Sequence, residues 1–316
     1  MSRPRRFRYS AGEMERDPDV DVDVILATAS RLPRVDDDDG PLHAALAAQG
    51  VSARTLAWDD PGVDWGRARA CVIRSTWNYV HHHAAFLAWA ERCAAVTALW
   101  NPLAIIRWNS HKRYLVDLAH ARLPVVPTRL VERGQSFDLG ALASAWAGDV
   151  VVKPAISAGS LDTRRVARAD LATVGANHLG ALVAAGDALV QPFLTSVEGY
   201  GERALVWIDG ALTHAVRKSP RFAGDPQRIS AAVPIAPDEA ALAEAAIDWV
   251  VRTIATPAAA TTTSPPPLLY ARVDLARDQQ DRPCLMELEL VEPSLFLDRS
   301  PVARGRLAAA IKRLVG

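Results

Sequence analysis

Several features that mark large protein classes are scarce or missing in this chain of 316 residues. It has only three cysteines, Cys71, Cys93 and Cys284, which lie far apart and form no Cys-x-x-Cys pair. Their spacing excludes a disulfide framework and a cysteine zinc site, and it favours a reducing compartment. Basic and acidic residues number 36 each. The chain therefore lacks the basic excess that a dedicated nucleic-acid-binding protein usually carries.

Long apolar runs are also missing. The longest uncharged stretch, residues 253–271, contains Pro257 and three consecutive prolines at 265–267, so it cannot form a membrane helix. The N-terminus is rich in arginine, but no apolar run follows it, and it does not resemble a secretory signal. We expect a cytoplasmic protein with neither a membrane nor a nucleic acid as partner.

Two common nucleotide-binding motifs are absent as well. No Gly-x-Gly-x-x-Gly follows the first predicted strand, which argues against a dehydrogenase that uses the N-terminal region, and no Gly-x-x-x-x-Gly-Lys-[Ser/Thr] loop occurs. Half of the residues are hydrophobic and 23% are charged, which is a globular composition. At roughly 150 residues per domain, the length allows about two domains.

Strand and helix patterns alternate in the first third of the chain. Apolar runs at residues 22–29, 51–58 and 70–74 predict buried strands. Residues 42–49 and 83–95 predict helices between and after them. This alternation indicates a small parallel α/β domain. Residues 1–20, which are charged and aperiodic, are expected to form a disordered tail.

The remaining two thirds mix the two element types differently. Asn109 or Ser110 is expected to cap a helix that ends near Ala121, and Asp209-Gly210 is a strong hairpin signal. Other predicted strands cover residues 149–153, 188–194, 268–277 and 283–291, and other predicted helices cover 168–185, 237–253 and 300–315. Residues 256–267 are of low complexity and predict a surface insertion.

The last predicted hairpin gathers charged residues. Arg272 and Asp274 are two residues apart and share a face, as do Glu287 and Glu289 on the following strand. Antiparallel pairing in the right register would bring three carboxylates and a guanidinium into one patch. Such carboxylates suit Mg²⁺ shared with substrate phosphates. The alternative is an ordinary strand whose polar face meets water.

Two other segments have the chemistry of a nucleotide site. Lys153 ends a strand and opens the small-residue loop 154–163, whose backbone N–H groups can hold phosphate oxygens. Gln191-Pro192-Phe193 ends a later strand, and Glu198 follows, which suits adenine and ribose. A surface lysine before an ordinary turn and a polar loop are the respective alternatives.

Three further features attract attention and are interpreted structurally. The acidic run Asp36–Asp39 is expected to be a solvated loop in which Asp39 or a neighbour caps the next helix, rather than a cation site. The tract His81–His83 is not expected to bind a metal, because three consecutive residues cannot all face one ion. Most of the nine tryptophans are expected in packing, with Trp77 at a strand end as the exception.

Taken in order, these features resemble an ATP-grasp ligase over about residues 22–315. The resemblance is carried by Lys112 in NSHKRYL, Lys153-Pro154 with its loop, QPF with Glu198, RVD, and ELE with EPS. Within that superfamily the chain is similar to the small glutathione-synthetase-like branch, which includes the cycloserine-forming cyclo-ligases. The closer similarity lies in RSTWNY (74–79), residues 86–89, residues 101–115, PVVPT (124–128) and ELELVEPSLFL (287–297).

The resemblance implies an α/β fold of the α+β ATP-grasp type. It implies an N-terminal parallel α/β pre-ATP-grasp domain at residues 21–108, an ATP-grasp small (lid) subdomain with its leading helix at 109–190, and a C-terminal catalytic subdomain at 191–316. The last two would clamp ATP between them.

The resemblance also implies roles for individual residues. Lys112 and Lys153, with Ser157, Gly159 and Ser160 of the loop, match the groups that hold ATP phosphates, and Gln191, Phe193 and Glu198 match the adenine and ribose site. The matching catalytic residues are Arg272 and Lys218, with Arg217 as the alternative to Lys218. Asp274, Glu287 and Glu289 match the magnesium ligands, although many relatives have Asn at the last position. Residues that resemble substrate-contacting positions are Arg74, Ser75, Trp77, Glu292 and Ser294.

The implied reaction uses ATP and two Mg²⁺ ions, for which Mn²⁺ can substitute. A carboxylate of a small amino-acid-like substrate attacks the γ-phosphate, and an amine then attacks the acyl phosphate. The sequence leaves open an intramolecular ring closure, as in cycloserine formation, and an intermolecular ligation of the dipeptide or glutathione-synthetase type. A catalytically inactive nucleotide-binding module is a further alternative, against which the intact charged set argues. The resemblance also suggests antibiotic or amino-acid-derived metabolite biosynthesis, and it is compatible with a homo-oligomer.

Overall fold

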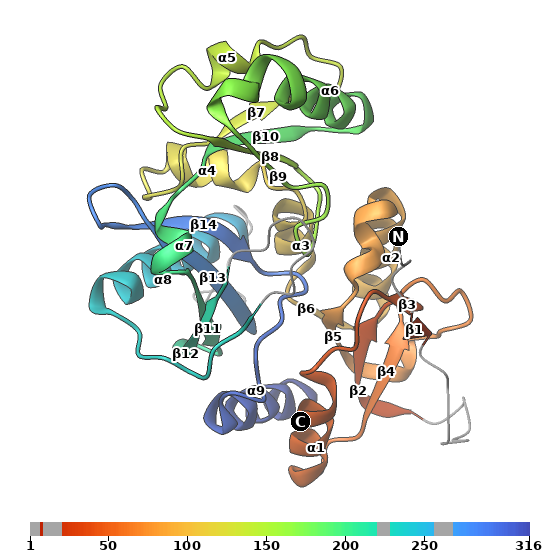
Figure 1. Ribbon diagram of the computed structural model, residues 1–316. Helices are drawn as coiled ribbons and strands as arrows, with labels where there is room; N and C mark the ends of the chain where they lie inside the picture. Colours follow the sequence, from red (N-terminus) through yellow and green to blue (C-terminus); the bar gives the residue numbers. More distant parts are fainter. Residues whose placement is uncertain (1–6, 9–20, 220–227, 256–267) are drawn as a thin grey trace.

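The computed structural model describes residues 7–8, 21–219, 228–255 and 268–316 (Figure 1). The predicted tail at 1–20 and the predicted insertion at 256–267 lie outside these ranges, except for the short strand β1 (Phe7–Arg8), which pairs with β3 (Arg31–Leu32). None of the helices in the described ranges has the length and apolarity needed to cross a membrane.

The first sheet is parallel, as the sequence predicted. Its order is β4-β2-β5-β6, formed by β2 (Val22–Thr28), β4 (Ala53–Ala57), β5 (Ala68–Ser75) and β6 (Ala98–Trp100). Helix α1 (Asp39–Ala48) packs on the face that carries Val24 and Leu26, and α2 (His83–Val96) packs on the face that carries Ile25 and Ala27. Because both faces are covered, the strands are apolar without alternation. Short 3₁₀ turns cover Trp65–Arg67 and Trp77–His81.

The second sheet is antiparallel, in the order β7-β10-β8-β9. It consists of β7 (Arg129–Val131), β8 (Val150–Pro154), β9 (Arg164–Val166) and β10 (Ala188–Pro192). Its own core includes residues of α5 (Leu139–Leu142) and α6 (Ala176–Ala185). A 3₁₀ turn (Arg168–Asp170) and a π turn (Leu171–Gly175) lead into α6, so the helix predicted over 168–185 is regular only in its second half.

The third sheet is also antiparallel, in the order β12-β11-β13-β14. Its strands are β11 (Glu202–Ile208), β12 (Ala211–Lys218), β13 (Tyr270–Arg277) and β14 (Pro283–Glu289), and α7 (Ser196–Gly199) precedes them. Asp209 and Gly210 both have positive φ, which confirms the predicted tight hairpin. Helix α8 (Pro237–Val250), followed by a π turn (Val251–Ala255), packs on one face of the sheet, and α9 (Pro301–Val315) joins its core to that of the first sheet.

The predicted helix that ends near Ala121 is present, but its predicted start and cap at Asn109 or Ser110 are wrong. The chain forms α3 (Leu103–Asn109), which ends where the prediction began, and α4 (Tyr114–His120). The Asn109 side chain caps neither helix, because it donates to the Leu288 carbonyl and accepts from the Leu290 N–H, at 2.8 Å each. It thereby fixes the end of β14. In the break between the helices, the Lys112 N–H donates to the Ala155 carbonyl at 2.7 Å, which holds Lys112 against the loop after β8.

Candidate active site

The hairpin of β13 and β14 has the register that gathers its charged residues. Arg272 lies opposite Glu289, and Asp274 lies opposite Glu287. Carboxylate oxygens of Asp274, Glu287 and Glu289 all lie within 4.8 Å of one another. The predicted convergence is therefore confirmed, and the alternative of a plain solvated strand face is wrong. Leu288 and Leu290 are buried as expected from the alternation.

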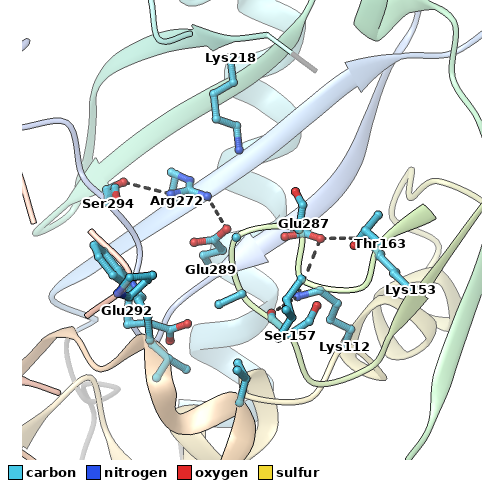
Figure 2. Close-up of a pocket in the computed structure, with 18 of the residues that line it drawn as sticks. Lys112, Lys153, Ser157, Thr163, Lys218, Arg272, Glu287, Glu289, Glu292 and Ser294 are labelled. Carbon is cyan, nitrogen blue, oxygen red and sulfur yellow. Dashed lines mark hydrogen bonds and ion pairs between the residues drawn. The ribbon is translucent and has the colours of Figure 1, made fainter. Parts of the chain in front are cut away.

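A cavity of about 1350 Å³ opens over this hairpin. Its walls come from the second and third sheets, from segments that follow strands of the first sheet, and from the segment that follows β14. Of the residues to which the sequence gave roles, these line the cavity: Lys112, Lys153, Ser157, Gly159, Ser160, Gln191, Phe193, Lys218, Arg272, Glu287, Glu289, Trp77, Glu292 and Ser294. Figure 2 shows Glu287 near the middle of this set, with Lys112, Lys153 and Ser157 on one side and Arg272 with Ser294 on the other.

Glu287 joins the two phosphate-side lysines. Lys153 Nζ lies 2.7 Å from Glu287 Oε1, and Lys112 Nζ lies 3.8 Å from the same oxygen. Lys112 Nζ also donates to the Ser157 carbonyl at 2.9 Å. Burial would raise the pKa of Glu287, but the charges of Lys112 and Lys153 hold it well below its usual range. Glu287 is thus an anion that keeps two cationic side chains together at the cavity wall.

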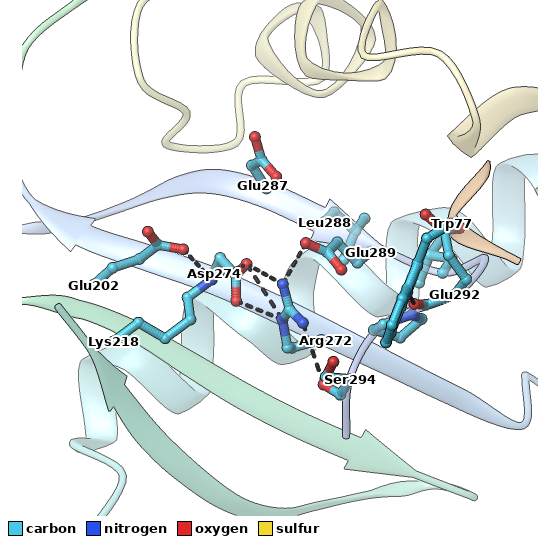
Figure 3. A network of polar contacts seen from close by, with 12 residues as sticks. Trp77, Glu202, Lys218, Arg272, Asp274, Glu287, Leu288, Glu289, Glu292 and Ser294 are labelled. Carbon is cyan, nitrogen blue, oxygen red and sulfur yellow. Dashed lines mark hydrogen bonds and ion pairs between the residues drawn. The ribbon is translucent and has the colours of Figure 1, made fainter. Parts of the chain in front are cut away.

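A second ion cluster surrounds Asp274, which is fully buried beneath the cavity. Arg272 donates to both oxygens of Asp274, and Lys218 Nζ lies 2.7 Å from Asp274 Oδ2 (Figure 3). Arg272 also pairs with Glu289, and Lys218 also pairs with Glu202. Burial tends to lower the pKa of Arg272, yet Asp274 and Glu289 raise it above its ordinary value. The guanidinium is therefore charged and held by carboxylates from two strands.

Sequence reasoning gave no specific role to Glu202. It lies directly opposite Lys218 in the β11–β12 register, and it lines the cavity. Burial raises the pKa of Glu202 to about 7, against the opposing effect of Lys218. Pairing about Asp209-Gly210 alone would set residue 202 opposite residue 217. An irregularity between Val206 and Trp207 shifts the register by one residue, and no local sequence signal indicated that Glu202 would face Lys218.

The choice between Lys218 and Arg217 follows from the period of the strand. Adjacent residues of a strand point to opposite faces. Lys218 is buried and lines the cavity, whereas Arg217 is exposed and donates to the Gly199 carbonyl on the other side. Within the described residues Arg217 makes no part of the cavity wall.

The predicted adenine side has a polar and aromatic lining. Gln191 Nε2 donates to Thr128 Oγ1 at 2.8 Å, and the ring of Phe193 lies under the Arg165 guanidinium at 3.8 Å. Arg165 also binds Glu198 at 2.7 Å. Glu198 itself is not among the described residues that line the cavity, so its ribose role remains a prediction. Arg165, which sequence reasoning missed, is the basic residue at this edge.

The loop after β8 has the backbone that its small residues suggest. Gly159 and Ser160 have φ values of 60° and 62°, in the left-handed region. A bulky side chain would be strained there. Both residues line the cavity, together with Ser157.

The wall contributed by the first domain differs from the prediction. Arg74 and Ser75 are buried beneath the wall rather than in it: Ser75 shares a hydrogen bond with Thr28, and Arg74 donates to Asp38 and to the Pro293 carbonyl. The expected solvated loop at 36–39 is wrong at two positions, because Asp36 is 4% exposed and Asp38 is 2% exposed. Asp38 precedes α1 but its side chain makes no cap.

The hairpin carboxylates fit a hard divalent cation. Mg²⁺ prefers oxygen ligands, and three carboxylates from two neighbouring strands supply them. Across the described ranges, this is the single group of three His, Cys, Asp or Glu side chains close enough to share an ion. Lysine and arginine side chains lie on both sides of this cluster, and their positive charge also suits a phosphate group.

Three comparisons, with family models, with curated proteins and with solved structures, each find similar proteins. A family model described as D-cycloserine synthetase DcsG, N-terminal domain, matches residues 24–101. The cycloserine biosynthesis protein DcsG of Streptomyces lavendulae is 36% identical over 299 residues, which cover 91% of this chain and 96% of that protein. The crystal structure of D-cycloserine synthetase DcsG matches with a TM-score of 0.82 and 35% identity, over 92% of this chain and 99% of that one.

More distant solved structures share the fold alone. The ATP-grasp ligase PsnB, complexed with its minimal precursor, matches with a TM-score of 0.62 and 20% identity, over 93% of this chain and 100% of that one. D-alanine–D-alanine ligase from Bacillus anthracis matches with a TM-score of 0.63 and 11% identity, over 94% and 97% of the two chains.

Proposed function

The chain belongs to the DcsG family of ATP-grasp ligases, and on this premise we propose that it closes a ring within one amino-acid-like substrate at the expense of ATP. As a member of that family it is an ATP-dependent enzyme that forms C–N bonds. The proposed substrate is an O-ureido-serine-like compound, and the proposed product is a cycloserine-like ring. The similarity to DcsG over nearly the full length of both chains favours this reaction over an intermolecular ligation.

The single observation that carries the proposal is the convergence of basic and acidic side chains at the cavity. Phosphoryl transfer depends mainly on positioning and on charge stabilisation. The cavity has Lys112 and Lys153 on one side of Glu287, and Arg272 and Lys218 on the other. A set of this kind has cationic groups for a triphosphate and oxygen ligands for its metal.

Magnesium has a natural place in this proposal. Asp274, Glu287 and Glu289 would hold it, and the ion would neutralise charge on the transferred phosphoryl group. One or two ions, and Mn²⁺ in place of Mg²⁺, are compatible with the three carboxylates. The basic side chains that now pair with these carboxylates would then be available to phosphate oxygens.

The proposed chemistry has two steps. A substrate carboxylate oxygen attacks the γ-phosphorus, and the bond to ADP breaks. The substrate nitrogen then attacks the acyl carbon, loses its proton, and expels inorganic phosphate with the former carboxylate oxygen. Ring closure itself removes the elements of one water from the substrate. With an O-ureido compound the ring nitrogen then still carries the carbamoyl group, and hydrolysis of that group to carbon dioxide and ammonia, which consumes one water, would leave the cycloserine-like ring. Arg272, held by Asp274 and by the Ser294 carbonyl at 3.2 Å, would stabilise the negative charge that develops at the acyl group.

Closure of the second sheet over the cavity would protect the intermediate. An acyl phosphate is hydrolysed when water reaches it, so the site must exclude solvent during both steps. The loop 154–163 and the strands β8 and β10 lie on this side of the cavity.

The test measures ADP release from Mg-ATP with a panel of amino acids and their ureido and aminooxy derivatives, each alone and then paired with amines. We expect turnover with one ureido compound alone. Mass spectrometry should find a product lighter by one water if the ring keeps the carbamoyl group, or lighter by one carbon dioxide and one ammonia if that group is lost. Turnover only with a pair would show an intermolecular ligase instead. ATP binding without turnover on any compound would support an inactive nucleotide-binding module.

A further inference from the structure

The segment that follows β14, residues 291–297, forms a wall of the active site without regular secondary structure of its own. Glu292, Ser294 and Phe296 of this segment line the cavity. Figure 3 shows Ser294 beside Arg272, with Glu292 and Trp77 nearby. Such a segment needs partners from other elements, because its backbone groups are not satisfied by a sheet or a helix.

Most of those partners are side chains from the first domain. Trp77 Nε1 donates to the Glu292 carbonyl at 3.1 Å, and Arg74 Nη2 donates to the Pro293 carbonyl at 3.1 Å. Asp38 accepts from the backbone N–H groups of Leu295 and Leu297, at 2.5 Å and 2.7 Å. The first domain therefore holds the segment at four backbone groups, in residues 292, 293, 295 and 297.

Asp38 is the centre of this arrangement. Each of its two oxygens accepts one backbone N–H, and Arg74 Nη2 lies 3.2 Å from Oδ2. Phe296, between the two donors, has a φ of 51°, which lets the N–H groups of residues 295 and 297 converge on one carboxylate. A bulky residue adopts this conformation only when its surroundings impose it. Asp38 is thus matched to the backbone shape of the segment.

The buried charge of Asp38 is matched as well. Arg74 is 2% exposed, and its Nε and Nη1 atoms have no hydrogen-bond partner among the described residues. Its guanidinium lies 5.3 Å from the ring centroid of Tyr270, whose hydroxyl donates to the Val291 carbonyl at 2.9 Å. A buried guanidinium with so few partners depends on its carboxylate for compensation.

The segment in turn contacts the residue to which we assign the reacting centre. Arg272 Nη1 donates to the Ser294 carbonyl at 3.2 Å, and Arg34 Nη2 donates to Ser294 Oγ at 2.8 Å. Ser294 is the residue between Pro293, held by Arg74, and Leu295, held by Asp38. Movement of these two neighbours would move the Ser294 carbonyl, and with it one of the acceptors that orient the guanidinium.

We propose that Asp38 is a positioning residue of the ligase, which fixes the Ser294 carbonyl, and through it Arg272, by holding the backbone of residues 295 and 297. It acts from the first domain on a group of the third sheet. This inference rests on the proposed role of Arg272. It predicts that the chemical step depends on Asp38, whereas ATP binding, which involves Lys112 and Lys153, does not.

The test uses the full-length protein and three variants. Asp38→Asn keeps the shape of the side chain, but its amide NH₂ group replaces one of the two oxygens that accept a backbone N–H. Asp38→Glu keeps the charge but moves the carboxylate by one methylene, so one of the two variants can be studied even if the other fails to fold. Asp23→Asn is the matched control, because Asp23 also accepts from a backbone N–H, that of Ser52 at 2.8 Å, and does not line the cavity.

The readouts are kcat, KM for ATP and for the amino-acid substrate, and hydrogen exchange of the Leu295 and Leu297 amides. In both Asp38 variants we expect kcat to fall by roughly 10- to 100-fold, since small misplacements of catalytic groups cost that much. We expect KM for ATP to change by less than about 3-fold, and the two amides to exchange at least about 10-fold faster. Asp23→Asn should leave all of these values within about 2-fold.

Two results would overturn the inference: unchanged protection of the two amides, or faster exchange with an unchanged kcat, which would leave Asp38 a purely structural residue. A parallel rise of KM for ATP would also count against it. If the unsubstituted protein turns over none of the panel, the proposed function fails and so does the catalytic part of this inference. Exchange then still decides whether Asp38 holds the segment.

Discussion

The hairpin carboxylates, Asp274, Glu287 and Glu289, and the aspartate run at 36–39 are both acidic, yet they are balanced by different kinds of partner. The hairpin carboxylates face the basic side chains Lys112, Lys153, Lys218 and Arg272 around a cavity. Asp38 of the run faces two backbone N–H groups and one buried guanidinium. The same chemical group therefore serves a site in one place and the framework of that site in the other.

The kind of partner decides what each group can do. Basic side chains on flexible stems can exchange a carboxylate for a phosphate, so a carboxylate paired with them is available to a metal ion when ATP arrives. Backbone N–H groups cannot turn away without a change of the chain itself. Substitutions should therefore separate the two acidic groups: at the hairpin activity should fall while stability changes little, and at Asp38 stability should fall together with activity.

The largest effect is expected for Glu287→Gln. The amide keeps the shape but removes the negative charge of a proposed metal ligand, and with it the anion between Lys112 and Lys153, so kcat for ADP release should fall by roughly 10³-fold or more. The free energy of unfolding should change little. Lys112 and Lys153 lose one counter-ion, but they lie at a cavity wall where water can hydrate them. A steady-state assay measures the expected loss of turnover, and calorimetry measures the expected unchanged Tm. Near-parent turnover would remove Glu287 from the metal site, and a large loss of Tm would make it part of the framework.

The next effect sharpens the assignment within the hairpin cluster. Lys218→Met should lower kcat by about 10²-fold, because Lys218 is the cation between Asp274 and Glu202 at the cavity. Arg217→Met, one residue away on the opposite face, is the matched control and should stay within about 2-fold of the parent. Equal losses in the two variants, measured as ADP release at saturating ATP, would contradict the assignment of the two faces.

The third prediction concerns the stability of the protein when Asp38 of the aspartate run at 36–39 is substituted. Asp38→Asn should lower the free energy of unfolding by about 2 to 3 kcal/mol, because a buried N–H group loses its charged acceptor. Asp37→Asn provides the contrast: the Asp37 side chain is 81% exposed and its contact with Arg34 spans 3.7 Å, so its stability should be nearly unchanged. Denaturant titrations monitored by tryptophan fluorescence measure both. Equal stabilities would show that the backbone contacts of Asp38 contribute nothing net.

The difference between the two acidic groups also shows what the sequence can reveal. The spacing of two residues in Arg272–Asp274 and in Glu287–Glu289 is a local property of a strand, so the hairpin carboxylates could be predicted. The backbone partners of Asp38 lie more than 250 residues further along the chain, and no local pattern indicates them. The same limit applies to Asn109. Its residue type suggested a helix cap, whereas its hydrogen-bond partners, Leu288 and Leu290, lie at the end of β14. Burial of Arg74 and Ser75 beneath the cavity wall likewise depends on how the domains pack.

A third kind of carboxyl gives the smallest effect. Glu292 lines the cavity, and among the described residues it forms no ion pair with a basic side chain. Burial, with a further contribution from Glu289, raises the pKa of Glu292 from 4.5 to about 8. Between these two values the folded protein retains a proton that the unfolded chain has released. The stability that the protonated carboxyl provides is therefore complete below pH 4.5 and is lost as the pH rises toward 8.

The corresponding test compares Glu292→Gln with the parent protein in the absence of ATP and metal. Since the amide does not titrate, the Tm of the parent should fall by a few degrees more than that of the variant between about pH 5 and pH 8. Glu202, whose pKa burial raises to about 7, is present in both proteins, so its contribution cancels in the difference. Glu198→Gln is the exposed control and should follow the parent curve. Parallel curves for Glu292→Gln and the parent would mean that Glu292 finds a compensating partner in solution, and that it belongs with the hairpin carboxylates after all.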